Sequence, residues 1–537
     1  MSAISTSAAE PALRFDNRFT RELPGDPESG SSRRQVHDAL YSRVLPTPVK
    51  RPELIAAARE VAELVGLTEE IVRSEDYVSV LTGNSVLAGM DPHATCYGGH
   101  QFGNWAGQLG DGRAINLGEV LNASGEHWML QLKGAGPTPY SRSADGLAVL
   151  RSSLREFLCS EAMHHLGVPT TRALSLTLTG ERVMRDMFYD GNAVLEPGAV
   201  VCRAAPSFTR FGHFEMLTAR GEIDLLHTFA AYTIRADFPD LAEPKDVADK
   251  TAYLDWFAEI CRRTATMIVQ WMRVGFVHGV MNTDNMSILG LTIDYGPYGW
   301  LENYDPDWTP NTTDASGKRY RFSHQPAIAR WNLIRLANAL YPLIDDAQRL
   351  EEIIGDFERI YLEGWQAMMA AKLGLKSFHA ATDTALFDEL SVVLQLAETD
   401  MTIFYRNLAQ IDVAKSLSDI PEVLLEAYYV TDQLTREVRE QVTRWLNDYL
   451  DRLSLDASEP QERRARMNAV NPKYVLRNYM AQVAIDAAEK SDFGVVNDLL
   501  ELLRRPYDEQ PGQESWAGRR PDWARTRAGC SMLSCSS

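Results

Sequence analysis

Hydrophobic and polar residues alternate along two neighbouring segments in the first third of the chain. In residues 126–133, Leu130 and Leu132 fall on one face of an extended chain, whereas Lys133 falls on the other. Residues 113–121 also read as a strand, and an Asn-Ala-Ser-Gly sequence of the kind that forms turns separates the two segments. The pattern predicts two strands joined by a short turn, with Lys133 at the end of the second.

Other segments carry apolar residues at the spacing of an α-helix. Leu150 and Leu154 belong to an apolar stripe along residues 147–166, which a glycine and a proline follow. Helices are also predicted over residues 52–64 and 251–274, and helices dominate the second half of the chain. Further short strands are predicted over residues 173–179, 182–188, 199–203, 286–289 and 291–294.

The order of these elements is a glycine-rich loop, two strands, a helix, more strands and then many helices. It is typical of an α+β fold with two lobes, as in protein kinases, with a β-rich N-lobe, a helical C-lobe and additional C-terminal helices. The predicted units are an extended arm (1–50), the N-lobe (51–212), the C-lobe (213–410), a helical extension (411–504) and an irregular tail (505–537).

The composition is that of a globular protein, because 45% of the 537 residues are hydrophobic and 24% are charged. The formal net charge of -19 disfavours binding to nucleic acid, whose phosphates require basic surfaces. No apolar run of about 18 residues predicts a membrane span, and residues 1–10 lack the apolar core of a signal peptide. The cysteines are scattered, which fits a reducing compartment. We therefore expect a cytoplasmic, monomeric protein without nucleic-acid or membrane partners.

The segment from His278 to Asn285 reads His-Gly-Val-Met-Asn-Thr-Asp-Asn, and Asp294-Tyr-Gly follows it. In protein kinases, the corresponding loop has an aspartate base two residues after the histidine and a metal-binding asparagine at its end. Here the base position is Val280, which cannot accept a proton, and a carboxylate stands instead at Asp284. The loop predicts either a kinase-like fold without activity or a different phosphate chemistry.

The amide of Asn285 and the carboxylate of Asp294 are oxygen ligands of the kind that Mg²⁺ prefers when substrate phosphates complete its shell. An ordinary turn rich in Asp and Asn is the alternative interpretation. Residues 98–112 are dense in glycine, which lets backbone N–H groups approach phosphates, although such loops are often only tight turns. Lys133 is a candidate phosphate ligand paired with Glu156, or else both lie on the surface. Further candidate cations are Arg113, Arg203 and Arg210.

Several motifs, taken together and in this order, resemble the SelO family of protein adenylyltransferases, whose members are pseudokinases. The resemblance covers almost the whole chain. Its motifs include Gly98-Gly-His-Gln-Phe-Gly103, Gln131-Leu-Lys-Gly-Ala-Gly136, His278-Gly-Val-Met-Asn-Thr-Asp-Asn285, Asp294-Tyr-Gly-Pro297 and Asn471-Pro-Lys-Tyr-Val-Leu-Arg-Asn478.

The resemblance implies a kinase-like enzyme that binds ATP in a flipped orientation and transfers AMP to Ser, Thr or Tyr hydroxyls of proteins. It implies that Asp284 is the general base, that Asn285 and Asp294 hold Mg²⁺ or Mn²⁺, and that Glu156 forms an ion pair with Lys133. The nucleotide-binding residues that it implies are Gly110, Gly112, Arg113, Lys133, Asp145, Gly146, Arg203, Arg210 and Asp294.

Three other activities stay open on the sequence alone. One is a kinase that transfers the γ-phosphate with Asp284 as an unusual base. A second is transfer of UMP, because the sequence does not show what reads the base. A third is a scaffold that binds nucleotide without catalysis. The resemblance also makes Cys530 and Cys535 candidates for redox control, through a bridge within the tail or to another protein.

Overall fold

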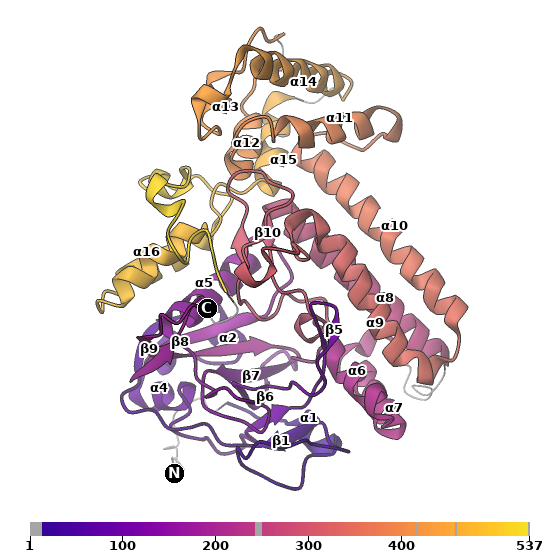
Figure 1. Cartoon of the computed structure of the whole chain (residues 1–537), viewed down its shortest axis with the longest axis vertical. Helices are drawn as coiled ribbons and strands as arrows, with labels where there is room; N and C mark the ends of the chain where they lie inside the picture. Colours follow the sequence, from indigo (N-terminus) through magenta and orange to yellow (C-terminus); the bar gives the residue numbers. More distant parts are fainter. Residues whose placement is uncertain (1–12, 242–249, 414–415, 457–458, 535–537) are drawn as a thin grey trace.

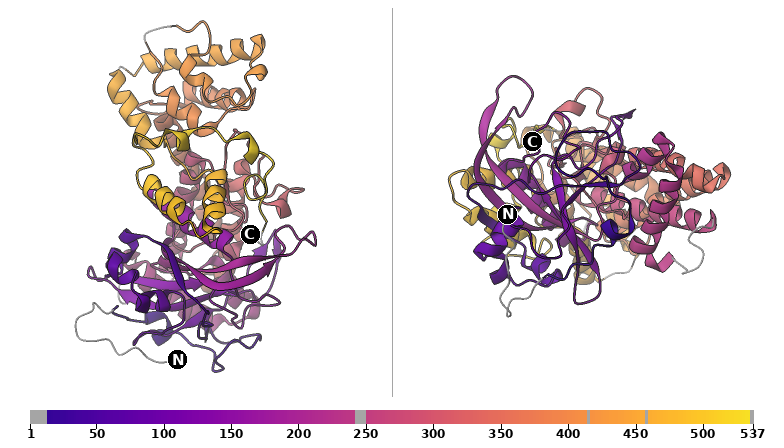
Figure 2. Two further views of the ribbon diagram at one scale, coloured as in Figure 1. Left: turned by 90° about the vertical axis from the view of Figure 1, so that its left-hand side faces the viewer. Right: turned by 90° about the horizontal axis from the view of Figure 1, so that it is seen from below.

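The computed structural model describes residues 13–241, 250–413, 416–456 and 459–534. The first part of the chain holds the large β-sheet, and helices dominate the rest (Figure 1). Figure 2 shows the sheet and the helices α11 to α15 at opposite ends of the molecule. The prediction of a mixed α and β fold, with a sheet-rich N-terminal part and a helical C-terminal part, is confirmed.

Seven strands form one antiparallel sheet in the order β1-β3-β6-β7-β9-β8-β2. The predicted hairpin of two alternating segments is present at its centre as β6 and β7. The bounds are β1 Tyr41–Arg43, β2 Glu53–Ala57, β3 His93–Thr95, β6 Ala114–Leu121, β7 His127–Lys133, β8 Arg172–Arg185 and β9 Val194–Ala205.

The two faces of β7 enter different cores, as its alternation predicts. Leu130 and Leu132 are buried in a core shared with α2 (Arg59–Leu64) and α4 (Glu75–Leu81). Met129, on the other face, joins the larger core that includes α5 (Leu150–His165). Because side chains alternate along a strand, the Lys133 side chain leaves β7 on the α5 side.

The helical part is built around α8 (Lys250–Val274), which packs against α9 (Gln325–Ile344) and the long helix α10 (Ala347–Lys372). Farther along the chain, α16 and α17 return to pack against α5. The remaining longer helices are α6 Phe211–Arg220, α7 Ile223–Asp237, α11 Ala380–Val393, α12 Met401–Leu408, α14 Arg436–Ser454, α15 Pro460–Val470, α16 Asn478–Ala488 and α17 Gly494–Leu503. No helix of the described segments has the length and apolar composition needed to cross a membrane.

Five predicted elements are wrong in detail. The helix over residues 52–64 begins only at Arg59, because its first half forms strand β2 on the edge of the sheet against β8. Glu-Leu-Ile-Ala-Ala suits either state, and tertiary pairing decides it. The strands at 286–289 and 291–294 are single bridges at Ser287 and Thr292. The two strands over 173–188 are one continuous strand, β8.

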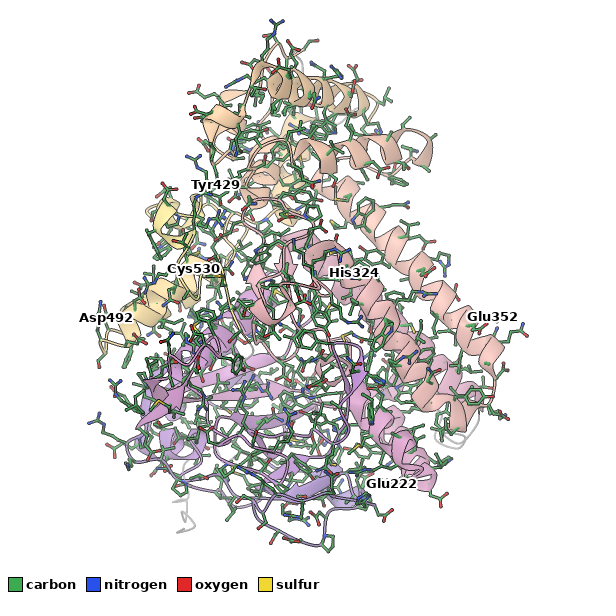
Figure 3. The ribbon with its side chains drawn as sticks, viewed as in Figure 1. Glu222, His324, Glu352, Tyr429, Asp492 and Cys530 are labelled. Carbon is green, nitrogen blue, oxygen red and sulfur yellow. The ribbon has the colours of Figure 1, made fainter. Side chains whose placement is uncertain are left out.

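The tail runs back to the segment that follows Asp294-Tyr-Gly. Leu533 accepts a hydrogen bond from the N–H of Thr312 at 2.8 Å and donates one to the carbonyl of Pro310 at 3.0 Å. Cys530 is buried beside α16, on the opposite side of the molecule from α10 (Figure 3). Burial raises the pKa of its thiol to about 11, which disfavours the reactive thiolate. Cys535 lies outside the described residues, so the redox pair stays a prediction.

Candidate functional site

A single cleft of about 930 Å³ joins the sheet to the segment between His278 and Pro297. The glycine-rich loop forms one wall, and the end of β7 and the loop carrying Asp284 form others. The structure brings together every residue predicted to bind nucleotide or metal. The predicted residues that line the cleft are Gly110, Gly112, Arg113, Lys133, Asp145, Gly146, Arg203, Arg210, Asp284, Asn285 and Asp294.

Glu156 lies behind this cleft on α5 and joins two of its cations. Its carboxylate is 2.7 Å from Nζ of Lys133 and 2.9 Å from Nη1 of Arg203. Only 3% of Glu156 is exposed, so solvent does not screen these pairs. The other side of the Arg203 guanidinium donates to the side-chain oxygen of Gln131 on β7. The predicted Lys133–Glu156 pair is therefore present, and a second cation shares it.

Asp294 is surrounded by positive charge. Its Oδ1 lies 2.7 Å from Arg203 and 3.4 Å from Lys133, and its Oδ2 accepts a hydrogen bond from Arg210. Burial alone would raise the pKa of this carboxyl, but Arg210, Lys133 and Arg203 outweigh it and hold the pKa well below its usual range. The residue also has φ of 58°, a left-handed conformation that is uncommon outside glycine. Asp294 is thus a buried carboxylate that the neighbouring cations keep ionised, held in an uncommon backbone conformation.

Arg210 connects the two aspartates of the cleft. One guanidinium nitrogen donates both to the Asp294 carboxylate and, at 2.7 Å, to the backbone carbonyl of Asp284. The guanidinium lies over the Tyr97 ring, 4.6 Å from its centroid, and 3.7 Å from Asp111. These contacts fix a buried cation between the two carboxylates without placing it on the Asp284 side chain.

The Asp284 carboxylate has a different environment. Its Oδ2 accepts a hydrogen bond from the Gln101 side chain at 3.1 Å, and its Oδ1 is buried without a hydrogen-bond partner among the described residues. A Cβ added at Gly99 would lie 2.7 Å from Oδ1, so this glycine makes room for the carboxylate. Burial raises the pKa of Asp284 to about 6. A carboxyl with such a pKa can accept a proton near neutral pH.

His278 supports the site from behind. Its Nδ1 accepts a hydrogen bond from the N–H of Val280 at 3.4 Å, so Nε2 carries the proton and donates to the Ile293 carbonyl at 2.9 Å. The ring therefore ties the loop of Asp284 to the segment of Asp294. Val280 lines the cleft at the position where a kinase places its acid, and a valine can neither accept nor donate a proton there.

The residues fit a divalent ion that shares its shell with a substrate. The Asn285 amide donates through Nδ2 to the Val280 carbonyl at 3.0 Å, which leaves its oxygen as a possible ligand beside Asp294. The described residues contain no group of three or more His, Cys, Asp or Glu side chains that could hold a metal alone. Mg²⁺ commonly binds through one or two protein oxygens plus phosphates, so this small donor set suits it.

The predicted glycines have packing reasons that the structure makes visible. A Cβ at Gly110 would lie 2.5 Å from the Tyr140 ring, and one at Gly146 would collide with the backbone of Gly136. The carboxylate of Asp145 forms two hydrogen bonds with Arg185, at 2.7 and 2.9 Å. These predicted residues line the cleft together with Arg185.

Three residues that line the cleft, Gln101, Asp111 and Arg185, were missed from the sequence, and so was Gln131, which accepts a hydrogen bond from Arg203. Gln131 shares the strand face of Lys133, so alternation was a usable signal for it. Gln101 stands in the glycine-rich segment, but its contact with Asp284 spans more than 180 positions of the chain and leaves no local pattern.

Comparison with known proteins identifies one family model and several relatives that match nearly the whole chain. A family model described as "Protein adenylyltransferase SelO" matches residues 30–504. A protein of Rhodopirellula baltica named "Protein nucleotidyltransferase YdiU" is 61% identical over 536 residues, which covers 98% of this chain and 99% of the relative. Proteins of the same name from an Azoarcus species and from Flavobacterium johnsoniae are 61% and 55% identical, each with 98% of this chain and 99% of the relative covered.

Proposed function

The chain belongs to the SelO family of protein adenylyltransferases, and on this premise we propose that it transfers AMP from ATP to Ser, Thr or Tyr hydroxyls of proteins and releases pyrophosphate. As a member of this family it is a nucleotidyltransferase. The observation that carries the proposal is the position of Asp284: a buried carboxylate that can take a proton shares one cleft with a cluster of cations, while Val280 stands at the kinase base position.

In the proposed reaction, the cations of the cleft bind the phosphates of ATP. Lys133, Arg203 and Arg210 already lie together around Asp294, and Arg113 lines the same cleft. Because pyrophosphate leaves when Pα is attacked, negative charge grows on the β- and γ-phosphates, and fixed cations stabilise it. Glu156 keeps Lys133 and Arg203 in place from behind. The proposal places ATP in the flipped orientation, in which Pα and not Pγ faces Asp284.

Asp284 is the proposed general base. The acceptor hydroxyl gives its proton to this carboxylate as its oxygen attacks Pα. Burial supports the role because it raises the pKa of Asp284 to about 6, close to the pH at which the base works. A hydroxyl that attacks Pα instead of Pγ needs a base at a different place, which a shift from position 280 to Asp284 provides.

Asn285 and Asp294 are the residues that would hold Mg²⁺ or Mn²⁺. The bound ion would neutralise phosphate charge. Both oxygens of Asp294 already contact cations, so a metal competes with Arg203 and Arg210 for this carboxylate. Phosphates give those cations other partners, which favours binding of the metal together with the nucleotide.

We also propose a kinase-like arrangement of two lobes, with the boundary near residue 212, and action in the cytoplasm. The two-lobe proposal is supported by the position of the cleft between β7 on one side and the loop of Asp284 on the other. The scattered, buried cysteines support a reducing compartment.

A label-transfer experiment tests the proposed reaction. The protein and an acceptor protein are incubated with Mg²⁺ or Mn²⁺ and ATP labelled at either the α- or the γ-phosphate. Label from the α-phosphate alone is expected. Label from the γ-phosphate would establish a kinase with a displaced base, and no label with ATP still bound would establish a scaffold. Labelled UTP in a parallel reaction distinguishes UMP transfer from AMP transfer.

A further inference from the structure

A short hairpin crosses from the glycine-rich segment to the loop that carries Asp284. Its strands are β4 (His100–Gln101) and β5 (Asn104–Trp105). The backbone is anchored on both sides of Gln101. The N–H of His100 donates to Oγ1 of Thr283 at 2.7 Å, and the N–H of Phe102 donates to Oδ1 of Asn282 at 3.1 Å. These hydrogen bonds hold the hairpin against the two residues that precede Asp284.

A tyrosine from a distant segment strengthens this anchor. The hydroxyl of Tyr320 donates to Oδ1 of Asn282 at 2.6 Å and accepts from the N–H of Phe102 at 3.1 Å. The Tyr320 side chain also packs against the Phe102 ring, with 5.3 Å between the ring centroids. Gln101 therefore projects from a backbone that is fixed at both neighbouring positions, so its side chain has little freedom to move away from the loop.

The two oxygens of Asp284 are held by different means. Oδ1 packs against Gly99, where even a methyl group would be too close, and it is buried. Oδ2 accepts the N–H of the Gln101 side chain at 3.1 Å, and both side chains line the cleft. The carboxylate thus has one orientation, in which Oδ2 is the oxygen that an acceptor in the cleft can reach. An oxygen that accepts one hydrogen bond keeps a lone pair for another.

We propose that Gln101 is a positioning residue for the acceptor step: its side-chain amide holds Oδ2 of Asp284 so that the free lone pair of this oxygen faces the acceptor hydroxyl. The proposal rests on the proposed role of Asp284. The hydroxyl proton passes to Oδ2, and the hydroxyl oxygen forms a bond to Pα. The bond from Pα to the bridging oxygen breaks, and pyrophosphate leaves with its electron pair. Gln101 exchanges no proton; it keeps the base aligned.

The test compares Gln101→Met with Asn104→Ala. Methionine is about as long as glutamine but donates no hydrogen bond, whereas Asn104 is an exposed residue of the same hairpin whose side chain donates to the Phe102 carbonyl. We expect kcat for label transfer to fall about tenfold to a hundredfold in Gln101→Met, with KM for ATP and the thermal midpoint essentially unchanged. Asn104→Ala should match the wild type. Gln101→Leu, which also offers no hydrogen-bond donor, is the second variant and should lose about as much.

Each result decides the proposal. A kcat within twofold of wild type in Gln101→Met would overturn it, and so would a parallel loss of ATP affinity and thermal stability, which indicates a merely structural contact. The rates are measured with both α- and γ-labelled ATP. If the wild type transfers the γ-label, the proposed function fails, but the role of Gln101 is still read from kcat because the same base serves the hydroxyl. If the wild type transfers neither label, both proposals fall.

Discussion

Asp284 and Asp294 lie in one cleft, but their surroundings shift the pKa values of the two carboxyl groups in opposite directions. Asp294 contacts Lys133, Arg203 and Arg210, and these cations hold its pKa well below the usual range despite burial. No ion pair within the described residues involves the Asp284 side chain, and burial raises its pKa to about 6. The placement of the cations therefore decides which buried carboxylate stays charged and which can take a proton.

The largest effects are expected when the carboxylates of Asp284 and Asp294 are removed one at a time. Asp284→Asn should lower transfer about a thousandfold or more while the Kd for ATP changes less than about threefold, because only the base is lost. Asp294→Asn should lower transfer and also raise the Kd for ATP, because this carboxylate holds the cations and the proposed metal. Label transfer and calorimetric titration with ATP measure the two effects. Retained transfer in Asp284→Asn would refute the assignment of the base.

The next largest effect is expected at Glu156, which pairs with Lys133 and Arg203 behind the cleft. Glu156→Gln leaves Lys133 and Arg203 buried with one carboxylate fewer, which should cost about 3 kcal/mol of the free energy of unfolding. Urea denaturation measures this loss. Glu363→Gln is the matched control, because its pair with Arg359 is exposed and should contribute nothing measurable. Equal stability of the two variants would show that Asp294 alone supports the cations.

The pH dependence of transfer should report Asp284 and not Asp294. Because burial raises the pKa of Asp284 to about 6, this base is ionised and active above that pH and protonated below it. We expect kcat to fall about tenfold for each pH unit below about 6 and to be level above about 7. Asp294 should stay ionised throughout, because its pKa lies well below the usual range. A rate that is unchanged down to pH 5 would contradict the assignment of Asp284 as the base that limits the rate.

The smallest effect is expected at Asp145, a third carboxylate that lines the cleft. Asp145 forms an ion pair with Arg185 at 2.7 Å and is half exposed. Asp145→Asn should raise KM for ATP about threefold to tenfold with kcat unchanged, because the proposal gives Asp145 a part in binding ATP and none in the chemical step. Steady-state kinetics at saturating acceptor separate the two constants. A fall in kcat would place Asp145 with the reacting end of the cleft.

Local patterns predicted the centre of the fold well. The hairpin of β6 and β7 and the helix α5 follow from alternation, a turn sequence and an apolar stripe, all of which act within a few residues. Strand β2 was missed because its sequence is neutral and its partner β8 lies more than 110 residues away. The sheet order likewise depends on pairings between distant strands that no local pattern encodes.

In the candidate site, too, local motifs predicted some features, whereas contacts between distant segments determine others. Motif spacing brought Lys133, Asp284 and Asp294 forward as candidates, and the structure gathers them in one cleft. Their electrostatic roles could not be read from the sequence, because they depend on which cations surround each carboxylate. Gln101 was missed for a related reason: its partner is fixed only when the hairpin of β4 and β5 packs on the loop of Asp284.

The pairing of Leu533 with Pro310 and Thr312 has a consequence for the growing chain. Thr313, the next residue, lines the cleft, so this edge of the site is supported by a segment translated about 220 residues later. At about 5–20 residues per second, that interval lasts about 10–45 s. A ribosome-bound chain therefore carries a cleft with an unsupported edge until Leu533 has been translated and has left the exit tunnel, which delays full assembly of the site by this interval.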